Sequence, residues 1–336
     1  MLSNLIKAHA LELGFDLAGI TPLGPVESAE RFDAWLAHGF AGEMAYLPRG
    51  AEKRRDTRLP FPGAKSAVVV ALNYDGTTPS GPIARYARGD DYHDVMLAKL
   101  DTLHRWIESH LAREVPGKAY VDTGPILERD LAHKAGLGWI GKNTNLINPD
   151  IGSYFFIGSL LLDLELEPDA PFDADRCGTC TRCLDACPTG AIVEPRVLDA
   201  TRCISYLTIE SRGAMPIDLR ESVGTLVYGC DICQEVCPWN VSFSRELSAP
   251  ELAPRKEIDL REALLDDEDE FRNRFRGSPI KRAKRRGLAR NIAVAMGNRR
   301  DRSDSDALTA ALDDPDEMVR EHAAWALRTI ADYGPR

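Results

Sequence analysis

The chain has 336 residues, of which 44% are hydrophobic and 28% are charged, and its formal net charge is −10. This ordinary globular composition excludes a disordered or collagen-like chain, and the length predicts two or three domains. The longest apolar runs, 67–72 and 154–162, are too short to span a membrane.

The first twenty residues predict an amphipathic helix. Their apolar residues follow helical spacing, and no basic leader, apolar core or twin arginine precedes them, so a secretion signal is not expected. The apolar positions of this helix are Leu2, Leu5, Ile6, Ala10 and Leu13. We therefore expect a cytoplasmic protein with no membrane association.

Strand and helix patterns alternate over the next part of the chain. Residues 67–72 predict a buried strand, residues 93–111 predict a helix with one apolar stripe, and residues 119–121 predict a short strand. This alternation indicates a first domain that combines helices with a sheet.

Asp122 directly follows the short strand and precedes a predicted helix. Pro125 suits the first turn of that helix, and Gly136 suits its C-terminal cap. Ligands of α/β sheets bind at the carboxyl ends of strands, so Asp122 is a candidate site residue. The alternative is an aspartate that only caps the helix.

All eight cysteines lie between residues 177 and 237. The first group has the spacing C-x2-C-x2-C-x3-C-P of bacterial ferredoxins, in which three thiolates of one loop bind one [4Fe–4S] cluster and the fourth binds the other cluster. The second group differs, because its first ligand is displaced to Cys203. The spacing predicts two crossed ligand sets: Cys177, Cys180, Cys183 and Cys237 on one cluster, and Cys203, Cys230, Cys233 and Cys187 on the other.

Two zinc sites or a set of disulfides are the alternatives. The spacing is poor for tetrahedral zinc, and disulfides need an oxidising compartment. Two clusters indicate one-electron transfer in series. The chain is much longer than a two-cluster ferredoxin, so we expect more than an electron carrier.

The C-terminal region predicts helices and carries a block of positive charge. A shift of 31 residues aligns 288–296 with 319–327, which predicts a short helical repeat of the HEAT type. Residues 272–302 contain twelve Lys and Arg against one acid, a net charge of +11, so the other residues sum to −21. A basic helical face predicts a nucleic-acid partner, and a solvated face is the alternative. The residues expected to contact nucleic acid are Lys281, Arg282, Lys284, Arg285, Arg286 and Arg290.

Four segments carry a family resemblance: VDTGPILERDLAHKAGLGWIGKNT, CGTCTRCLDACPTGAI, RCISYLTIE and YGCDICQEVCPWN. The cysteine runs alone are generic, whereas the first segment and RCISYL are much more specific. Together with the C-terminal helices, the four segments resemble the epoxyqueuosine reductase family over essentially the whole chain. That family reduces the epoxide of epoxyqueuosine at the wobble position of tRNA to give queuosine, using cobalamin and two [4Fe–4S] clusters.

The resemblance implies an α+β multidomain fold. Residues 1–170 would form an α/β cobalamin-binding domain similar to that of reductive dehalogenases, and residues 171–245 a ferredoxin-like domain with two clusters. Residues 246–336 would form a HEAT-like helical region with a basic face that binds tRNA. An electron donor, not identified by the sequence, is a further implied partner, and we expect a monomer.

The resemblance also implies site residues. Asp122 takes the role of proton donor, with its pKa raised by burial beside the corrin ring. The chain lacks the D-x-H-x-x-G motif that supplies a histidine below the cobalt in many cobalamin proteins, which agrees with this family. The positions expected to contact cobalamin are Arg54, Ala84, Asn143, Leu146, Ile157 and Ser205.

Three rival functions fit parts of the chain. A corrinoid reductive dehalogenase would share the clusters, but it usually has a twin-arginine leader and lacks a basic helical repeat. A ferredoxin-type carrier needs neither corrinoid nor tRNA. A tRNA-binding module without enzymatic activity would explain the basic block but not the clusters.

Overall fold

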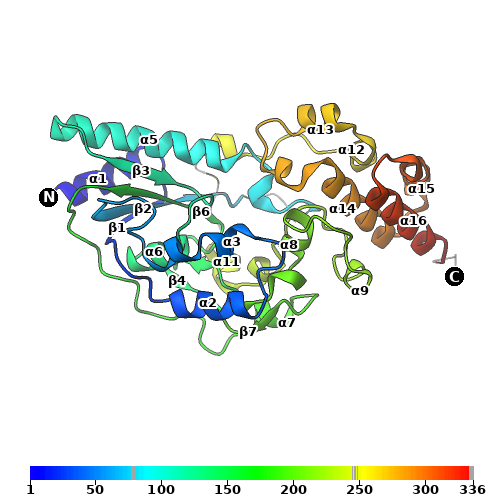
Figure 1. The fold of residues 1–336 in the computed structure, drawn as a ribbon, viewed down its shortest axis with the longest axis horizontal. Helices are drawn as coiled ribbons and strands as arrows, with labels where there is room; N and C mark the ends of the chain where they lie inside the picture. Colours follow the sequence, from blue (N-terminus) through cyan, green and yellow to red (C-terminus); the bar gives the residue numbers. More distant parts are fainter. Residues whose placement is uncertain (77–80, 244, 246, 248, 333–336) are drawn as a thin grey trace.

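The structure is a computed structural model that describes residues 1–76, 81–243, 245, 247 and 249–332 (Figure 1). Its central sheet has four strands in the order β1-β2-β6-β3. The strands are β1 (Leu17–Pro22), β2 (Ser66–Asn73), β3 (Gly117–Tyr120) and β6 (Phe155–Leu162). Every neighbouring pair is antiparallel, so the rule for ligands in parallel α/β sheets does not account for the position of Asp122.

Strand β2 is buried along its whole length because helices cover both faces of the sheet. Val68 and Val70 pack on the side of α1 and α5, whereas Val69 and Ala71 pack on the side of α6. These helices are α1 (Leu2–Glu12), α5 (Tyr92–Leu111) and α6 (Glu128–Lys134). Successive residues of a strand point to opposite faces, so a strand covered on both sides needs an unbroken apolar run. The predicted strand at 67–72 and the predicted helix at 93–111 are confirmed.

Short elements connect this sheet to the cysteine segment. Helices α7 and α10 each begin between the two cysteines of a C-x2-C pair, and they pack against each other. The short elements are α2 (Ala29–Ala37), α3 (Tyr46–Arg49), α4 (Ala51–Arg55), β4 (Trp139–Ile140), β5 (Leu146–Ile147), α7 (Arg182–Asp185), β7 (Ile192–Glu194), β8 (Val197–Leu198), α8 (Ile204–Ile209), α9 (Ile217–Arg220), α10 (Ile232–Glu235) and α11 (Pro238–Phe243). The cysteine segment therefore consists mainly of loops and single helical turns.

The C-terminal helices gather at the end of the molecule opposite the sheet (Figure 1). They are α12 (Leu260–Leu265), α13 (Glu268–Arg274), α14 (Lys284–Arg299), α15 (Ser305–Ala310) and α16 (Glu317–Asp332). Helices α14 and α16, which contain the two segments aligned by the 31-residue shift, pack closely against each other. The helices predicted for the C-terminal region are confirmed, while the HEAT-like repeat stays a prediction. Within the described part of the chain, no helix has both the length and the apolar character needed to cross a bilayer.

Candidate active site

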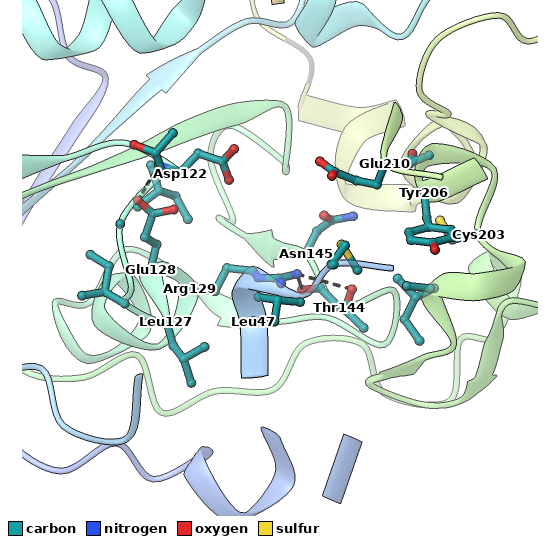
Figure 2. A pocket seen from close by; sticks show the side chains of 18 of the residues that line it. Leu47, Asp122, Leu127, Glu128, Arg129, Thr144, Asn145, Cys203, Tyr206 and Glu210 are labelled. Atoms are coloured by element: carbon teal, nitrogen blue, oxygen red, sulfur yellow. Dashed lines mark hydrogen bonds between the residues drawn. The ribbon is translucent and has the colours of Figure 1, made fainter. Parts of the chain in front are cut away.

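A cavity of about 2140 Å³ lies between the sheet, the cysteine segment and the C-terminal helices. Pockets for drug-sized ligands usually occupy about 300–1,000 Å³, so this cavity suits a much larger ligand or two ligands together. Figure 2 shows Asp122 on one side of it and Cys203 and Glu210 on the other. Arg282 also lines it. Candidate proton-donor, cluster and tRNA residues therefore border one space.

Asp122 lies on a loop between β3 and α6, and its side chain is 66% exposed because it borders the cavity. Its backbone has a φ of 59°, a left-handed conformation in which aspartate is enriched. The Asp122 N–H donates to Glu128 Oε1 at 2.7 Å. Helix α6 begins at Glu128, so the prediction that Pro125 lies in its first turn is wrong. Leu127 occupies the N-cap, which contradicts the reading of Asp122 as a cap.

A chain of polar contacts leads to the Asp122 carboxylate. Tyr92 Oη donates to Asp122 Oδ2 at 3.0 Å, and His93 Nε2 lies 3.5 Å from the same oxygen. The other ring nitrogen, His93 Nδ1, lies 2.6 Å from Asp91 Oδ1. Lys281 Nζ lies 2.8 Å from the second oxygen of Asp91. The sequence patterns gave no sign of His93, because Asp122 is distant from it along the chain and only the fold brings the two together.

These contacts shift the pKa of Asp122. Partial desolvation inside the cavity acts to raise the pKa of Asp122, but the hydrogen bond and charge of His93 and the hydrogen bond from Tyr92 outweigh it, so the pKa is lowered. The expectation of a raised pKa concerns Asp122 beside the corrin ring, and for that state it stays a prediction. Burial lowers the pKa of His93, but the hydrogen bonds with Asp122 and Asp91 raise it to about 9 overall. Burial and the charge of Asp122 raise the pKa of Glu128. At neutral pH, His93 thus carries a proton and Asp122 is ionised.

Three of the six expected cobalamin contacts border the cavity: Arg54, Ile157 and Ser205. Arg54 is only 7% exposed, and its Nη1 has no hydrogen-bond partner among the described residues. A buried guanidinium nitrogen without a partner costs free energy, so it indicates a ligand that accepts its hydrogen bond. The size of the cavity and this unpaired donor fit a large cofactor with polar side groups.

The other three expected contacts lie elsewhere. Asn143 borders a second, smaller cavity, and its side-chain amide donates to the Cys233 carbonyl at 3.4 Å. Ala84 and Leu146 are buried and line neither cavity. The neighbouring Asn145 does line the large cavity (Figure 2), and the sequence offered no signal to prefer it over Asn143.

The eight thiols form no disulfide, and they separate into two groups in space. The second cavity, of about 250 Å³, is bordered by Cys177, Cys180, Cys183 and Cys237. In the other group, burial and the nearby thiols of Cys203 and Cys187 raise the pKa of Cys230 to about 12. The fold thus brings Cys237 to the first group and Cys187 toward the second, while the ligand sets stay a prediction. Cys203 also borders the large cavity.

Two residues of the basic block are buried. Arg290 is 1% exposed and donates to the carbonyls of Ser211 and Gly213, just after α8. Arg285 donates to both carboxylate oxygens of Asp314. The hydrogen bonds of these guanidinium groups join α14 to neighbouring segments, and their N–H donors point into the protein. The prediction that Arg290 contacts nucleic acid is therefore wrong. Arg285 also lines the large cavity, so for this residue the contact stays a prediction.

The other four predicted basic residues are exposed: Lys281, Arg282, Lys284 and Arg286. Three of them lie within 3.5 Å of a carboxylate, so their charges are partly neutralised. Within the described chain, Lys284 has no carboxylate partner. Lys281, Arg282 and Lys284 line the large cavity, which places their positive charge beside Asp122.

Comparisons with known proteins agree with this arrangement. Residues 176–240 match the family described as "4Fe-4S double cluster binding domain", so the cysteine segment binds two [4Fe–4S] clusters. Residues 54–123 match the family described as "Epoxyqueuosine reductase QueG, DUF1730". The epoxyqueuosine reductase of Pseudomonas aeruginosa is 41% identical to this chain over 341 residues, which cover 97% of this chain and 94% of that protein. The chain belongs to the epoxyqueuosine reductase family.

Solved structures of epoxyqueuosine reductases share the whole fold. One is a crystal structure with an epoxyqueuosine-modified tRNA-Tyr stem loop, which is 33% identical with a TM-score of 0.89, covering 98% of this chain and 90% of that one. Another, from Bacillus subtilis, has its catalytic aspartate loop swung out of the active site, with the same identity, TM-score and coverage. These likenesses establish the architecture of the chain as that of an epoxyqueuosine reductase.

Proposed function

We propose that this protein reduces epoxyqueuosine to queuosine at the wobble position of tRNA. One observation carries the proposal: a single cavity is bordered by the loop aspartate Asp122, the cluster thiol Cys203 and the basic residues Lys281 and Lys284. A proton source, an electron source and a surface that attracts phosphate are the three things that this reaction requires.

Cobalamin and two [4Fe–4S] clusters are the cofactors of the proposed reaction. Arg54, Ile157 and Ser205 would hold cobalamin from the cavity wall, with the unpaired Arg54 Nη1 donating to a polar group of the cofactor. When bound, cobalamin supplies a reduced cobalt centre beside the epoxide. The crossed cysteine sets hold the two clusters, with Cys203 on the side of the large cavity.

The protein's own residues supply protons. Both carbon–oxygen bonds of the epoxide break, and the oxygen leaves as water, which takes two electrons and two protons. The Asp122 carboxyl delivers a proton to the leaving oxygen, and His93 Nε2, 3.5 Å away, restores it. Substrate that fills the cavity displaces water from Asp122, which raises its pKa toward that of a proton carrier.

Three domains are part of the proposal. Residues 1–170 hold the sheet and Asp122, residues 171–245 hold all eight thiols, and residues 246–336 hold the helices that follow. We assign the tRNA-binding role to the exposed basic residues of the third region, on a HEAT-like pair formed by α14 and α16.

The decisive experiment combines loaded enzyme with modified RNA. Protein reconstituted anaerobically with iron, sulfide and cobalamin is mixed with a chemical reductant and a stem loop that contains epoxyqueuosine. Mass spectrometry of the released nucleoside should show the loss of one oxygen atom. Absence of this change, in protein whose absorption spectrum shows clusters and bound cobalamin, would reject the proposed function.

The His93→Gln variant should change the pH profile of the reaction. His93 has a raised pKa of about 9, so the parent's kcat/KM should be retained through neutral pH and lost as pH rises through about 9. Without His93, Asp122 must take its proton directly from solvent. The pKa of Asp122 is lower than that of His93, so the loss of activity moves to lower pH. At neutral pH we expect kcat/KM to fall by about tenfold or more. An unchanged alkaline limb in the variant would separate His93 from proton delivery.

The double variant Lys284→Glu/Arg286→Glu should weaken tRNA binding. Each lost phosphate contact should reduce the salt slope by about 0.7–0.9 log units per decade of salt. The control is Arg113→Glu/Arg328→Glu, which makes the same charge change at exposed positions outside the cavity. Fluorescence anisotropy of a labelled stem loop measures both. If the two double variants bind equally, the basic face is only a solvated surface.

A further inference from the structure

The second cavity gives the first thiol group its own access to the surface. None of the residues that line it borders the large cavity. Cys177, Cys180, Cys183 and Cys237 face this cavity, whereas Cys203 of the other group borders the large one. Electrons that travel to the large cavity would therefore enter the protein at the first thiol group and leave from the second thiol group.

All charged side chains that line the second cavity, other than the thiols, are cations. Lys142 Nζ donates to the carbonyls of Gly178 and Cys180 in the thiol loop. Arg176 and Arg182 are exposed, and neither forms an ion pair within the described chain. On a chain with a net charge of −10, this is a local positive patch.

The carboxylates nearest to Arg176 and Arg182 along the chain have other partners, so they do not neutralise these arginines. Asp175 forms an ion pair with Arg196, and Asp185 accepts a hydrogen bond from Thr181 Oγ1 at 2.8 Å. The guanidinium of Arg176 instead lies over the Trp239 ring, 5.9 Å from its centroid. The patch therefore presents cations beside aromatic side chains.

Apolar side chains of α11 adjoin these cations. Trp239 stacks on Phe243 with a centroid distance of 5.4 Å. Phe243 is 41% exposed. Arginine and aromatic residues are enriched in protein–protein interfaces, and exposed apolar side chains next to a charged rim are typical of short-lived contacts. We call the surface formed by Arg176, Arg182, Trp239 and Phe243 the thiol face.

We propose that the thiol face is the docking surface for an acidic electron-carrier protein. This inference rests on the proposed function, because it names the partner that supplies its electrons. In each encounter the reduced carrier loses one electron and the cluster beside the thiol face gains it, so two encounters supply one epoxide reduction. Opposite charges speed such encounters without requiring tight binding, so the on-rate should depend on salt.

A protein suits this surface better than a second RNA site. The cysteine thiols open onto the same face, which makes it a place for electron transfer. The exposed Phe243 offers apolar contact that a phosphate backbone does not use. The exposed basic residues at the large cavity already provide the proposed RNA contact.

The test measures cluster reduction by stopped-flow absorbance, without tRNA or cobalamin. Reduced flavodoxin serves as the acidic protein probe, and reduced methyl viologen serves as a small cationic reductant. In Arg176→Glu/Arg182→Glu, reduction by flavodoxin at low salt should slow by roughly tenfold or more and lose most of its salt dependence. Reduction by viologen should be unchanged or faster. The control Arg113→Glu/Arg328→Glu should match the parent with both reductants.

A second variant, Phe243→Glu, changes the exposed aromatic side chain that stacks on Trp239. It should slow reduction by flavodoxin but not reduction by viologen. This variant therefore still tests the proposal if the arginine variant loads its clusters poorly. Equal slowing with both reductants, or parent rates with flavodoxin in both variants, would overturn the proposal. A loss of stem-loop binding in the arginine variant would assign the face to RNA instead. Because no epoxide is present, failure here is distinguishable from failure of the proposed function.

Discussion

Asp122→Asn should lower the turnover of epoxyqueuosine by about 10²–10⁴-fold. The change is nearly isosteric, and the amide still accepts the hydrogen bond from Tyr92, so the loop should keep its shape. It removes the group that passes a proton from His93 to the leaving oxygen. Single-turnover formation of queuosine in the stem loop measures the effect, while absorption spectra report the clusters and the cobalamin.

The matched control for this prediction is Asp130→Asn. Asp130 is a half-buried carboxylate of α6 that also borders the cavity, but it has no contact with His93. Its loss should change turnover by much less than the loss of Asp122. Full turnover by Asp122→Asn, or equal losses in both variants, would show that Asp122 does not donate the proton.

Cys203→Ser should abolish turnover and reduce the iron content from about eight to about four per chain. A cubane needs four thiolates, and we propose that Cys203, which borders the large cavity, is a ligand of the cluster on that side. Electrons could then reach the first cluster but not the epoxide. Iron and sulfide assays, with electron paramagnetic resonance of the reduced protein, measure what remains.

Cys187→Ser provides the test of the crossed ligand sets. Cys187 lies in the first cysteine run of the sequence, but the fold places it near Cys203 and Cys230. Its replacement should therefore remove the same resonance signal as Cys203→Ser and leave the signal lost in Cys177→Ser. The opposite pattern would mean that each cysteine run holds its own cluster, and stoichiometric zinc would refute the cluster assignment.

The sequence predicted those helices and strands whose apolar pattern lies within a single continuous segment. The unbroken apolar run of β2 required burial on both faces, and the apolar stripe of α5 required one buried side, and both elements formed where expected. Gly136 follows α6 with a φ of +80°, as a C-terminal cap requires. The start of α6 was missed by three residues because Pro125 fits a loop as well as a first helical turn.

By itself, the sequence determined the chemistry that covalent spacing and periodicity can encode. The spacing of the cysteine runs favours iron–sulfur clusters over zinc or disulfides, and the family motifs single out Asp122 as the candidate proton donor. Only the tertiary structure decided the properties that depend on distant neighbours. The pKa of Asp122 falls because His93 comes to its side from α5, and Arg290 cannot bind phosphate because carbonyls after α8 occupy its donors. The sequence gives the number of charged residues in a segment. Only the fold decides which of them are exposed and which are neutralised by partners from other segments.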